Sequence, residues 1–101
     1  MPRKKCLRYI GNTPDVTYYK PAGIPMRVLE EVVISLDEME AIRLADHENF
    51  YQEEAARLMN ISRQTFGRIL ESAHRKIAEA LLQGKAIRIE GGNVELNYDQ
   101  Q

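Results

Sequence analysis

The feature that most constrains this sequence is a short break at residues 60–62, between two segments with helical periodicity. Helices joined by a turn of only three or four residues must meet at a sharp angle, as they do in a helix-turn-helix. Asn60 occupies the turn position that usually holds glycine, and Asn tolerates a positive φ better than most side chains. The break therefore predicts a helix-turn-helix whose second helix is capped by Ser62.

The residues around this break fit that geometry jointly. Ala56 is small enough to let the two helices approach closely, and Ile61 fills the turn. Each match alone is weak, because small and apolar residues recur in every amphipathic helix. The positions expected to be buried are Ala55, Met59, Ile61, Phe66 and Ile69.

Three helices are expected, over about residues 35–48, 52–59 and 62–83. The first begins with a capping box formed by Ser35 and Glu38. The third is about 30 Å long, and the glycine that follows it suits a left-handed C-terminal cap. Its apolar stripe, predicted to face the core, consists of Phe66, Ile69, Leu70, Ala73, Ile77 and Leu81.

The segment before the helices, residues 1–34, is predicted to be a basic, extended arm. Its prolines and glycines are too frequent for a helix of any length. Short strands are expected near residues 7–10, 16–19 and 32–34, which are rich in β-forming residues. Residues 20–25 are expected to form an ordered turn or a polyproline-like run.

The segment after the helices, residues 84–101, is predicted to be a β-hairpin and a tail. Residues 87–90 and 94–96 alternate in polarity around a Gly-Gly-Asn turn signal. The hairpin or the strand near residues 32–34 would form a wing or a dimer seam. The fold class is mainly α with some β, and 101 residues suffice for one domain.

Composition argues against several classes of protein. The single cysteine, Cys6, cannot form an intramolecular disulfide, and His47 and His74 complete no spaced zinc set. No apolar run approaches the roughly 20 residues that span a bilayer, and no signal-peptide core follows Met1, so we expect a cytoplasmic protein. No nucleophile, base and orienting group occur at a recognisable spacing, so neither an enzyme nor a cofactor is expected.

Charge is distributed unevenly along the chain, although the formal net charge is only −1. Residues 1–27 carry six Lys and Arg against one acid, and residues 61–90 carry six against three. Residues 28–60, in contrast, carry two Arg against nine acids. Two basic segments therefore flank an acidic one, which is compatible with a polyanionic partner.

The third helix carries the residues that would contact double-stranded DNA. Its outward arc holds Gln64, Arg68, Glu71 and Arg75, and Gly67 leaves room for the nucleic-acid backbone. Arg63 and Gln64 would touch base edges, Arg68 and Arg75 bases or phosphates, and Ser62 and Thr65 phosphates. The basic residues of the arm that would follow the backbone or enter a minor groove are Arg3, Lys4, Lys5 and Arg8.

Two other interpretations remain open. Glu71 can pair with Arg68 and Arg75, which would make this face an ordinary solvated surface. Alternatively, the helix-turn-helix serves as a protein-protein adaptor whose acidic first helix docks a basic partner. If DNA is the partner, a homodimer is expected, because one such helix reads only a few base pairs.

Four runs of sequence closely resemble the uncharacterised protein family 0251, also called domain of unknown function 134. They are residues 19–25, 36–46, 62–71 and 84–92, and the likeness extends over about residues 2–92. The resemblance implies membership of a set of prokaryotic proteins predicted to bind DNA. This chain departs from the family at Tyr51, where a Ser commonly caps the second helix.

The third helix is also similar to the helix-turn-helix of sigma factor region 4. The likeness lies in its Ser62-Arg63 start and its Ala73 and Arg75-Lys76 continuation. It implies promoter-type contacts by Arg63, Gln64 and Arg68. No polymerase-binding regions accompany it here. Some family members resemble fusions to an iron-molybdenum-cofactor-binding domain, which is absent from this sequence, so no cofactor is implied.

Overall fold

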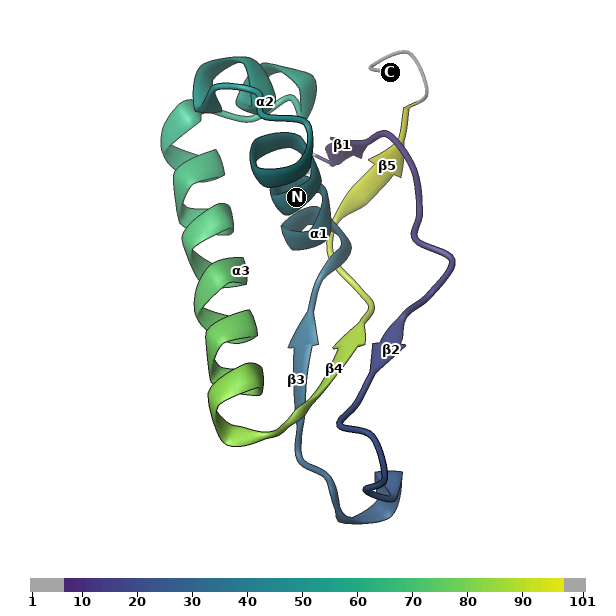
Figure 1. Ribbon diagram of the computed structural model, residues 1–101. Coiled ribbons are helices and arrows are strands. Elements are labelled where there is room, and N and C mark those ends of the chain that lie inside the picture. Colours follow the sequence, from purple (N-terminus) through teal and green to yellow (C-terminus); the bar gives the residue numbers. More distant parts are fainter. Residues whose placement is uncertain (1–6, 98–101) are drawn as a thin grey trace, which may run out of the picture.

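Residues 7–97, the part of the chain that the computed structural model describes, form three β-strands, then three α-helices, then two more β-strands. In chain order the elements are β1 (Arg8–Ile10), β2 (Tyr18–Tyr19), the 3-10 turn η1 (Met26–Val28), β3 (Glu31–Ile34), α1 (Leu36–Ile42), the π-helical turn η2 (Arg43–His47), α2 (Gln52–Leu58), α3 (Arg63–Gln83), β4 (Ala86–Ile89) and β5 (Val94–Leu96). Helix α3 runs along one side of the molecule, and α2 lies across its N-terminal end (Figure 1). The fold is therefore of the α+β class. Within the described residues, every helix is too short or too polar to cross a membrane.

Helix α1 begins at the predicted capping box. Ser35 Oγ accepts a hydrogen bond from the Glu38 N–H at 3.4 Å, and Glu38 Oε1 accepts one from the Ser35 N–H at 2.9 Å. The helix predicted for residues 35–48 is not uniform, because regular α-helix gives way to the π turn η2. This turn is closed by a hydrogen bond from the Glu48 N–H to the Arg43 carbonyl at 2.8 Å.

The connection between α2 and α3 has the conformation that the sequence predicts. Only residues 59–62 separate the two helices. Asn60 has a φ of 63°, in the left-handed region. Ser62 Oγ caps α3 by accepting a hydrogen bond from the Thr65 N–H at 3.1 Å. The chain therefore reverses direction within four residues without a glycine.

The outer ends of α2 and α3 differ in how they are capped. Tyr51 precedes α2 and makes no side-chain capping hydrogen bond, yet the helix begins at Gln52, as predicted. Gly84 ends α3 with a φ of 66° and donates its N–H to the Ala80 carbonyl. Glycine has no Cβ and adopts this left-handed conformation without a steric clash, so α3 ends where the sequence predicts.

The three helices enclose a small apolar core. It consists of Ala41, Leu44, Ala55, Ala56, Met59, Phe66 and Leu70. Ile61 and Ile69 are half-buried and pack against it, as the sequence predicts. Leu81, predicted to face the core, is instead 75% exposed. Helix α3 instead turns the small side chains of Ala73 and Ala80 inward, where both are buried. Leu81 follows Ala80 directly and therefore points about 100° away from it around the helix axis.

The strands pair differently from the hairpin predicted for residues 84–101. Both strands are present, but β4 lies between β2 (antiparallel) and β3 (parallel), whereas β5 pairs in parallel with β1. Gly91 and Gly92 have φ values of 84° and 103°, and the Gly91 carbonyl accepts a hydrogen bond from the Leu36 N–H at 2.9 Å. A Cβ on Gly92 would lie 2.9 Å from Asp37 Oδ1. The turn therefore carries the chain across the start of α1 instead of folding it back on β4.

Within residues 8–34, the strands β1, β2 and β3 belong to the two sheets, so this segment is not the separate arm that the sequence predicts. The expected strands correspond to β1, β2 and β3, and each is paired. Ile10 is 2% exposed, and Val32 and Ile34 are buried beneath the helices. The sequence did not indicate this because the partner strands, β4 and β5, lie at the other end of the chain. Residues 1–6 lie outside the described residues.

Candidate nucleic-acid interface

The side of α3 that points away from the core carries the predicted DNA-contacting side chains. Phe66, Leu70, Ala73 and Ala80 bury one side of the helix. Among the residues that the structure leaves exposed on α3 are Arg63, Gln64, Arg68, Glu71 and Arg75. From Gln64 to Arg75 this row extends about 16 Å along the helix axis. We call these five residues the α3 face.

The arginines of the α3 face differ from most other cations in residues 7–97, because they form no ion pair there. The cations paired with carboxylates are Arg8, Arg43, Arg57, Lys76, Lys85 and Arg88. Lys20 and Arg27 also have no carboxylate partner among these residues, but they lie in the segment from β2 to η1 and not on a long helix. Within residues 7–97, the α3 face is therefore the place where several arginines without an ion-pair partner lie on one helix.

Glu71 lies on the same face but does not neutralise it. Within the described residues, Glu71 forms no ion pair with Arg68 or Arg75, although both lie at helical spacings that would allow one. Glu71 instead points into solvent as an exposed side chain. The geometry therefore leaves the guanidinium groups of Arg68 and Arg75 available to an external anion.

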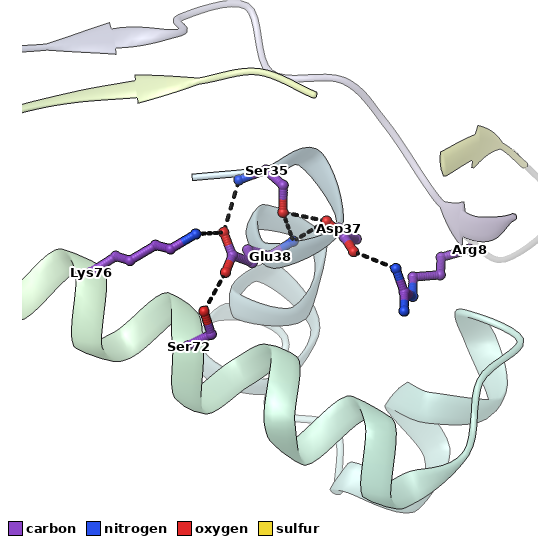
Figure 2. Close-up of polar contacts among 6 residues, drawn as sticks. All are labelled: Arg8, Ser35, Asp37, Glu38, Ser72 and Lys76. Carbon is purple, nitrogen blue, oxygen red and sulfur yellow. Dashed lines mark hydrogen bonds and ion pairs between the residues drawn. The ribbon is translucent and has the colours of Figure 1, made fainter. Parts of the chain in front are cut away.

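A buried carboxylate at the start of α1 fixes the rotation of α3 from the other side (Figure 2). Glu38 accepts hydrogen bonds from Ser72 Oγ at 2.6 Å and from Lys76 Nζ at 3.0 Å, both on α3. Burial raises the pKa of Glu38, but the hydrogen bonds from Ser72, the Ser35 N–H and Lys76 outweigh it, and the pKa lies below its ordinary value. Turning α3 would break these bonds, so Glu38 holds the α3 face outward.

Arg8, predicted to contact DNA, is engaged within the protein. Its Nη1 donates to Asp37 Oδ2 at 3.0 Å, and its side chain is 30% exposed. Arg8 Nε is buried and has no hydrogen-bond partner among the described residues. Its charge is therefore compensated by α1. Arg3, Lys4 and Lys5, predicted to act with it, lie outside the described residues.

The two hydroxyl groups predicted to bind phosphates form a local pair. Ser62 Oγ donates to Thr65 Oγ1 at 2.9 Å while accepting from the Thr65 N–H. Ser62 is exposed and Thr65 is half-buried. Both hydroxyls therefore lie at the start of α3, next to the α3 face, with their main hydrogen bonds serving the helix cap.

Gln52 is a neighbour of this site that the sequence did not reveal. A Cβ built on Gly67 would lie 3.4 Å from Gln52 Oε1, so the amide occupies part of the space that Gly67 leaves open. Gln52 is the first residue of α2 and is exposed. The crossing of α2 and α3 alone brings the two residues together, and no local pattern in the sequence signals it.

The acidic side chains of residues 28–60 are mostly engaged with cations or a histidine. Those in ion pairs are Glu30, Glu31, Asp37, Glu38, Glu40, Asp46, Glu48 and Glu54. Only Glu53 of the nine acids in this segment lacks such a contact within the described residues. Among residues 7–97, no group of three or more His, Cys, Asp or Glu side chains is placed to hold a metal ion.

Comparisons with known proteins agree with the motifs in the sequence. The family model described as "Protein of unknown function DUF134" matches residues 1–97. A UPF0251 protein of Thermoanaerobacter sp. (strain X514) is 50% identical over 101 residues, which are 100% of this chain and 89% of that protein. A UPF0251 protein of Dehalococcoides mccartyi is 58% identical over 97 residues, 96% of this chain and 83% of that protein. No solved structure matches the chain significantly. The protein therefore belongs to the DUF134, or UPF0251, family.

Proposed function

We propose that the protein binds double-stranded DNA through the α3 face, as a helix-turn-helix homodimer that regulates transcription. The observation that carries this proposal is the set of exposed arginines, Arg63, Arg68 and Arg75, which have no carboxylate partner among residues 7–97. Guanidinium groups are suited to bidentate contacts with phosphates and with guanine. An ordered row of them on one helix is the arrangement that a polyanion requires.

The residues at the start of α3 would read sequence. In a helix-turn-helix the N-terminal residues of the second helix contact base edges in the major groove. Arg63 would then bind guanine and Gln64 adenine, while Arg68 and Arg75 contact bases or phosphates. Ser62 and Thr65 are close enough to the same end to reach phosphate oxygens.

The shape of the α2–α3 unit supports the same proposal. The left-handed conformation of Asn60 and the buried side chains of Ala55, Met59 and Phe66 hold the two helices at a fixed crossing. Glu38 and Lys76 hold the rotation of α3 from the core side. A rigid helix that presents its polar side outward costs little reorganisation on binding.

A homodimer follows from the small footprint of a single α3. One helix contacts only a few base pairs, so a two-fold assembly with its α3 helices about 34 Å apart would read two half-sites. The exposed leucines at the C-terminal end of α3, Leu81 and Leu82, are 75% and 86% exposed. They are the apolar residues of α3 that a second copy would cover, and the β2–β4–β3 sheet is the alternative seam.

The adaptor alternative rests on the acidic segment and is less well supported. It requires acids that are free to dock a basic partner, whereas eight of the nine acids in residues 28–60 already contact a cation or a histidine. The unpaired charges on the described surface of α3 are mainly positive. This distribution favours an anionic partner.

The experiment is a salt titration of binding to a random DNA duplex. The logarithm of the affinity is expected to fall with the logarithm of salt concentration, by a slope of about 0.9 per phosphate contact. The double variant Arg63→Ala, Arg68→Ala should bind more weakly and with a smaller slope. A matched control, Arg27→Ala with Arg57→Ala, removes the same charge elsewhere and should bind like the wild type. Equal binding by both double variants would leave the adaptor in place.

A further inference from the structure

A cavity of about 500 Å³ lies beside α1 and the π turn η2, away from the α3 face. Its apolar lining residues are Pro14, Leu36, Met39 and Ile42. Its polar lining residues are Asn12, Glu40, Arg43, His47 and Glu48. Small-molecule sites have volumes of roughly 300–1,000 Å³ and combine an apolar lining with a few convergent polar groups.

Among the polar lining residues, Glu40 and Arg43 form an ion pair with each other. Glu40 is buried, and its carboxylate accepts hydrogen bonds from Arg43 Nε at 3.0 Å, from Arg43 Nη2 at 2.7 Å and from the Gly11 N–H at 2.8 Å. The hydrogen bonds to Glu40 hold the pKa of Arg43 above its ordinary value. The opposite formal charges of Glu40 and Arg43 therefore cancel and contribute no net charge to the cavity.

Glu48 is the acid of the cavity whose contacts are long, although it lies within ion-pair distance of Arg43 and His47. Its carboxylate lies 3.6 Å from Arg43 Nη1 and 3.6 Å from His47 Nδ1, which is too far for a good hydrogen bond. Within the described residues its side chain accepts no hydrogen bond, and it is 42% exposed. With His47 neutral, the formal charges facing the cavity sum to −1.

The local backbone places this carboxylate at the rim of the cavity. The π turn inserts an extra residue into the helical register between Arg43 and Glu48, and the Glu48 N–H closes the turn on the Arg43 carbonyl at 2.8 Å. Single π turns within helices are frequent at functional sites, because they redirect side chains that a regular helix would place elsewhere. Here Arg43, His47 and Glu48, which lie in the turn or directly after it, line the same cavity as Leu36, Met39 and Ile42 of α1.

The geometry points to a binding site for a small organic cation with an apolar body, such as an amine attached to a short aryl or alkyl group. The apolar body would lie against Leu36, Met39 and Ile42, and the ammonium group would donate hydrogen bonds to Glu48. An anionic ligand would face a lining whose formal charge is negative. This site is separate from the α3 face and does not depend on DNA binding.

The test uses methyl NMR spectra of the full chain, titrated with phenethylammonium chloride. Matched probes of similar size are 2-phenylethanol, which is neutral, and phenylacetate, which is an anion. The expected result is a saturable shift of the Met39 and Ile42 methyl signals with a dissociation constant of about 1 mM, while the exposed methyls of Leu82 stay unchanged. The alcohol should bind about fivefold more weakly, and the anion more weakly still.

Two variants test whether the Glu48 carboxylate causes the preference for the ammonium probe. Glu48→Gln should weaken binding of the ammonium probe about fivefold and leave the alcohol unaffected. The matched control, Glu53→Gln, removes a carboxylate outside the cavity and should bind like the wild type. No saturable shift, equal binding of amine and alcohol by the wild type, or preferred binding of phenylacetate would each overturn the proposal. The three probes test it on the wild-type protein even if a variant fails to fold.

Discussion

Gly67 lies in the interior of α3, where glycine is unfavourable for a helix. We expect Gly67→Ala to raise the free energy of unfolding by about 0.5–1 kcal/mol, because alanine loses less conformational entropy on folding. The added Cβ would lie 3.4 Å from Gln52 Oε1, which is at the end of a flexible side chain and can move. Urea denaturation of the two proteins measures the difference, and a lower stability of the variant would contradict it.

The same variant tests the role assigned to Gly67 at the α3 face. If this position leaves room for the DNA backbone, Gly67→Ala should weaken binding to a DNA duplex while it stabilises the fold. Opposite changes in the two measurements cannot come from partial unfolding. An affinity equal to that of the wild type would show that DNA binding does not need the space left by the missing side chain at Gly67.

Glu38 should make the stability of the protein depend on pH. Its pKa is below the ordinary value in the folded state, so its contribution is present above the unfolded value, about 4.3, and is lost as the pH falls toward the folded pKa. At pH 7, Glu38→Gln should lower the free energy of unfolding by about 1.5–3 kcal/mol, because Lys76 and Ser72 lose a charged acceptor. Denaturation curves at pH 7, 5, 4 and 3 should show the gap between variant and wild type narrowing below about pH 4.3. A gap that stays constant to pH 3 would contradict this role.

At the level of elements, the turn between α2 and α3 depends on the left-handed conformation of Asn60. Asn60→Ala should destabilise the protein by about 1 kcal/mol, because a Cβ without a polar side chain disfavours a positive φ. Asn60→Gly is the matched control and should be at least as stable as the wild type, since the φ of 63° suits glycine. Thermal unfolding of the three proteins gives the comparison. Equal loss in both variants would assign the effect to the Asn side chain instead of the backbone.

Local patterns were enough to predict most helices and strands, but not which strands pair. The capping residues Ser35 and Ser62 and the glycine at residue 84 act on their own helix ends, so their signals are contained in a few neighbouring residues. The partner of β5 is β1, whose residues are more than eighty positions away, and alternation of polarity carries no information about such a choice. The π turn η2 was also missed, because its periodicity differs from that of an α-helix by a single residue.

At the level of the whole molecule, sequence placed the α3 face correctly in solvent but could not show which charges are neutralised. Arg8 and Arg63 look alike in the sequence, and only the fold brings Asp37 within 3.0 Å of Arg8 while leaving Arg63 unpaired among the described residues. The contact between Gln52 and Gly67 likewise depends on how two helices cross. The charges counted along the sequence therefore predict an anion-binding surface less well than the charges that lack an ion-pair partner in the folded protein.

The proposed homodimer predicts the symmetry of its DNA sites. Duplexes selected from a random library should contain two copies of one short motif in inverted orientation, with centres about 10–10.5 base pairs apart. This spacing places both α3 helices on one side of the duplex. Enrichment of a single unrepeated motif would contradict the two-fold arrangement, and a lack of any enrichment at low salt would contradict sequence-specific binding itself.

Strands β1 and β5 pair in parallel, although the ribosome synthesises β1 long before β5. Arg8 pairs with Val94, and the Ile10 carbonyl accepts a hydrogen bond from the Asn97 N–H at 2.8 Å. The helices depend on closer neighbours and can form while translation continues. Strand β1, in contrast, cannot pair with β5 until residues 94–96 have been synthesised. A nonsense mutation just before residue 94 would therefore leave the front of the chain without its partner, although every residue of the helical core had been synthesised.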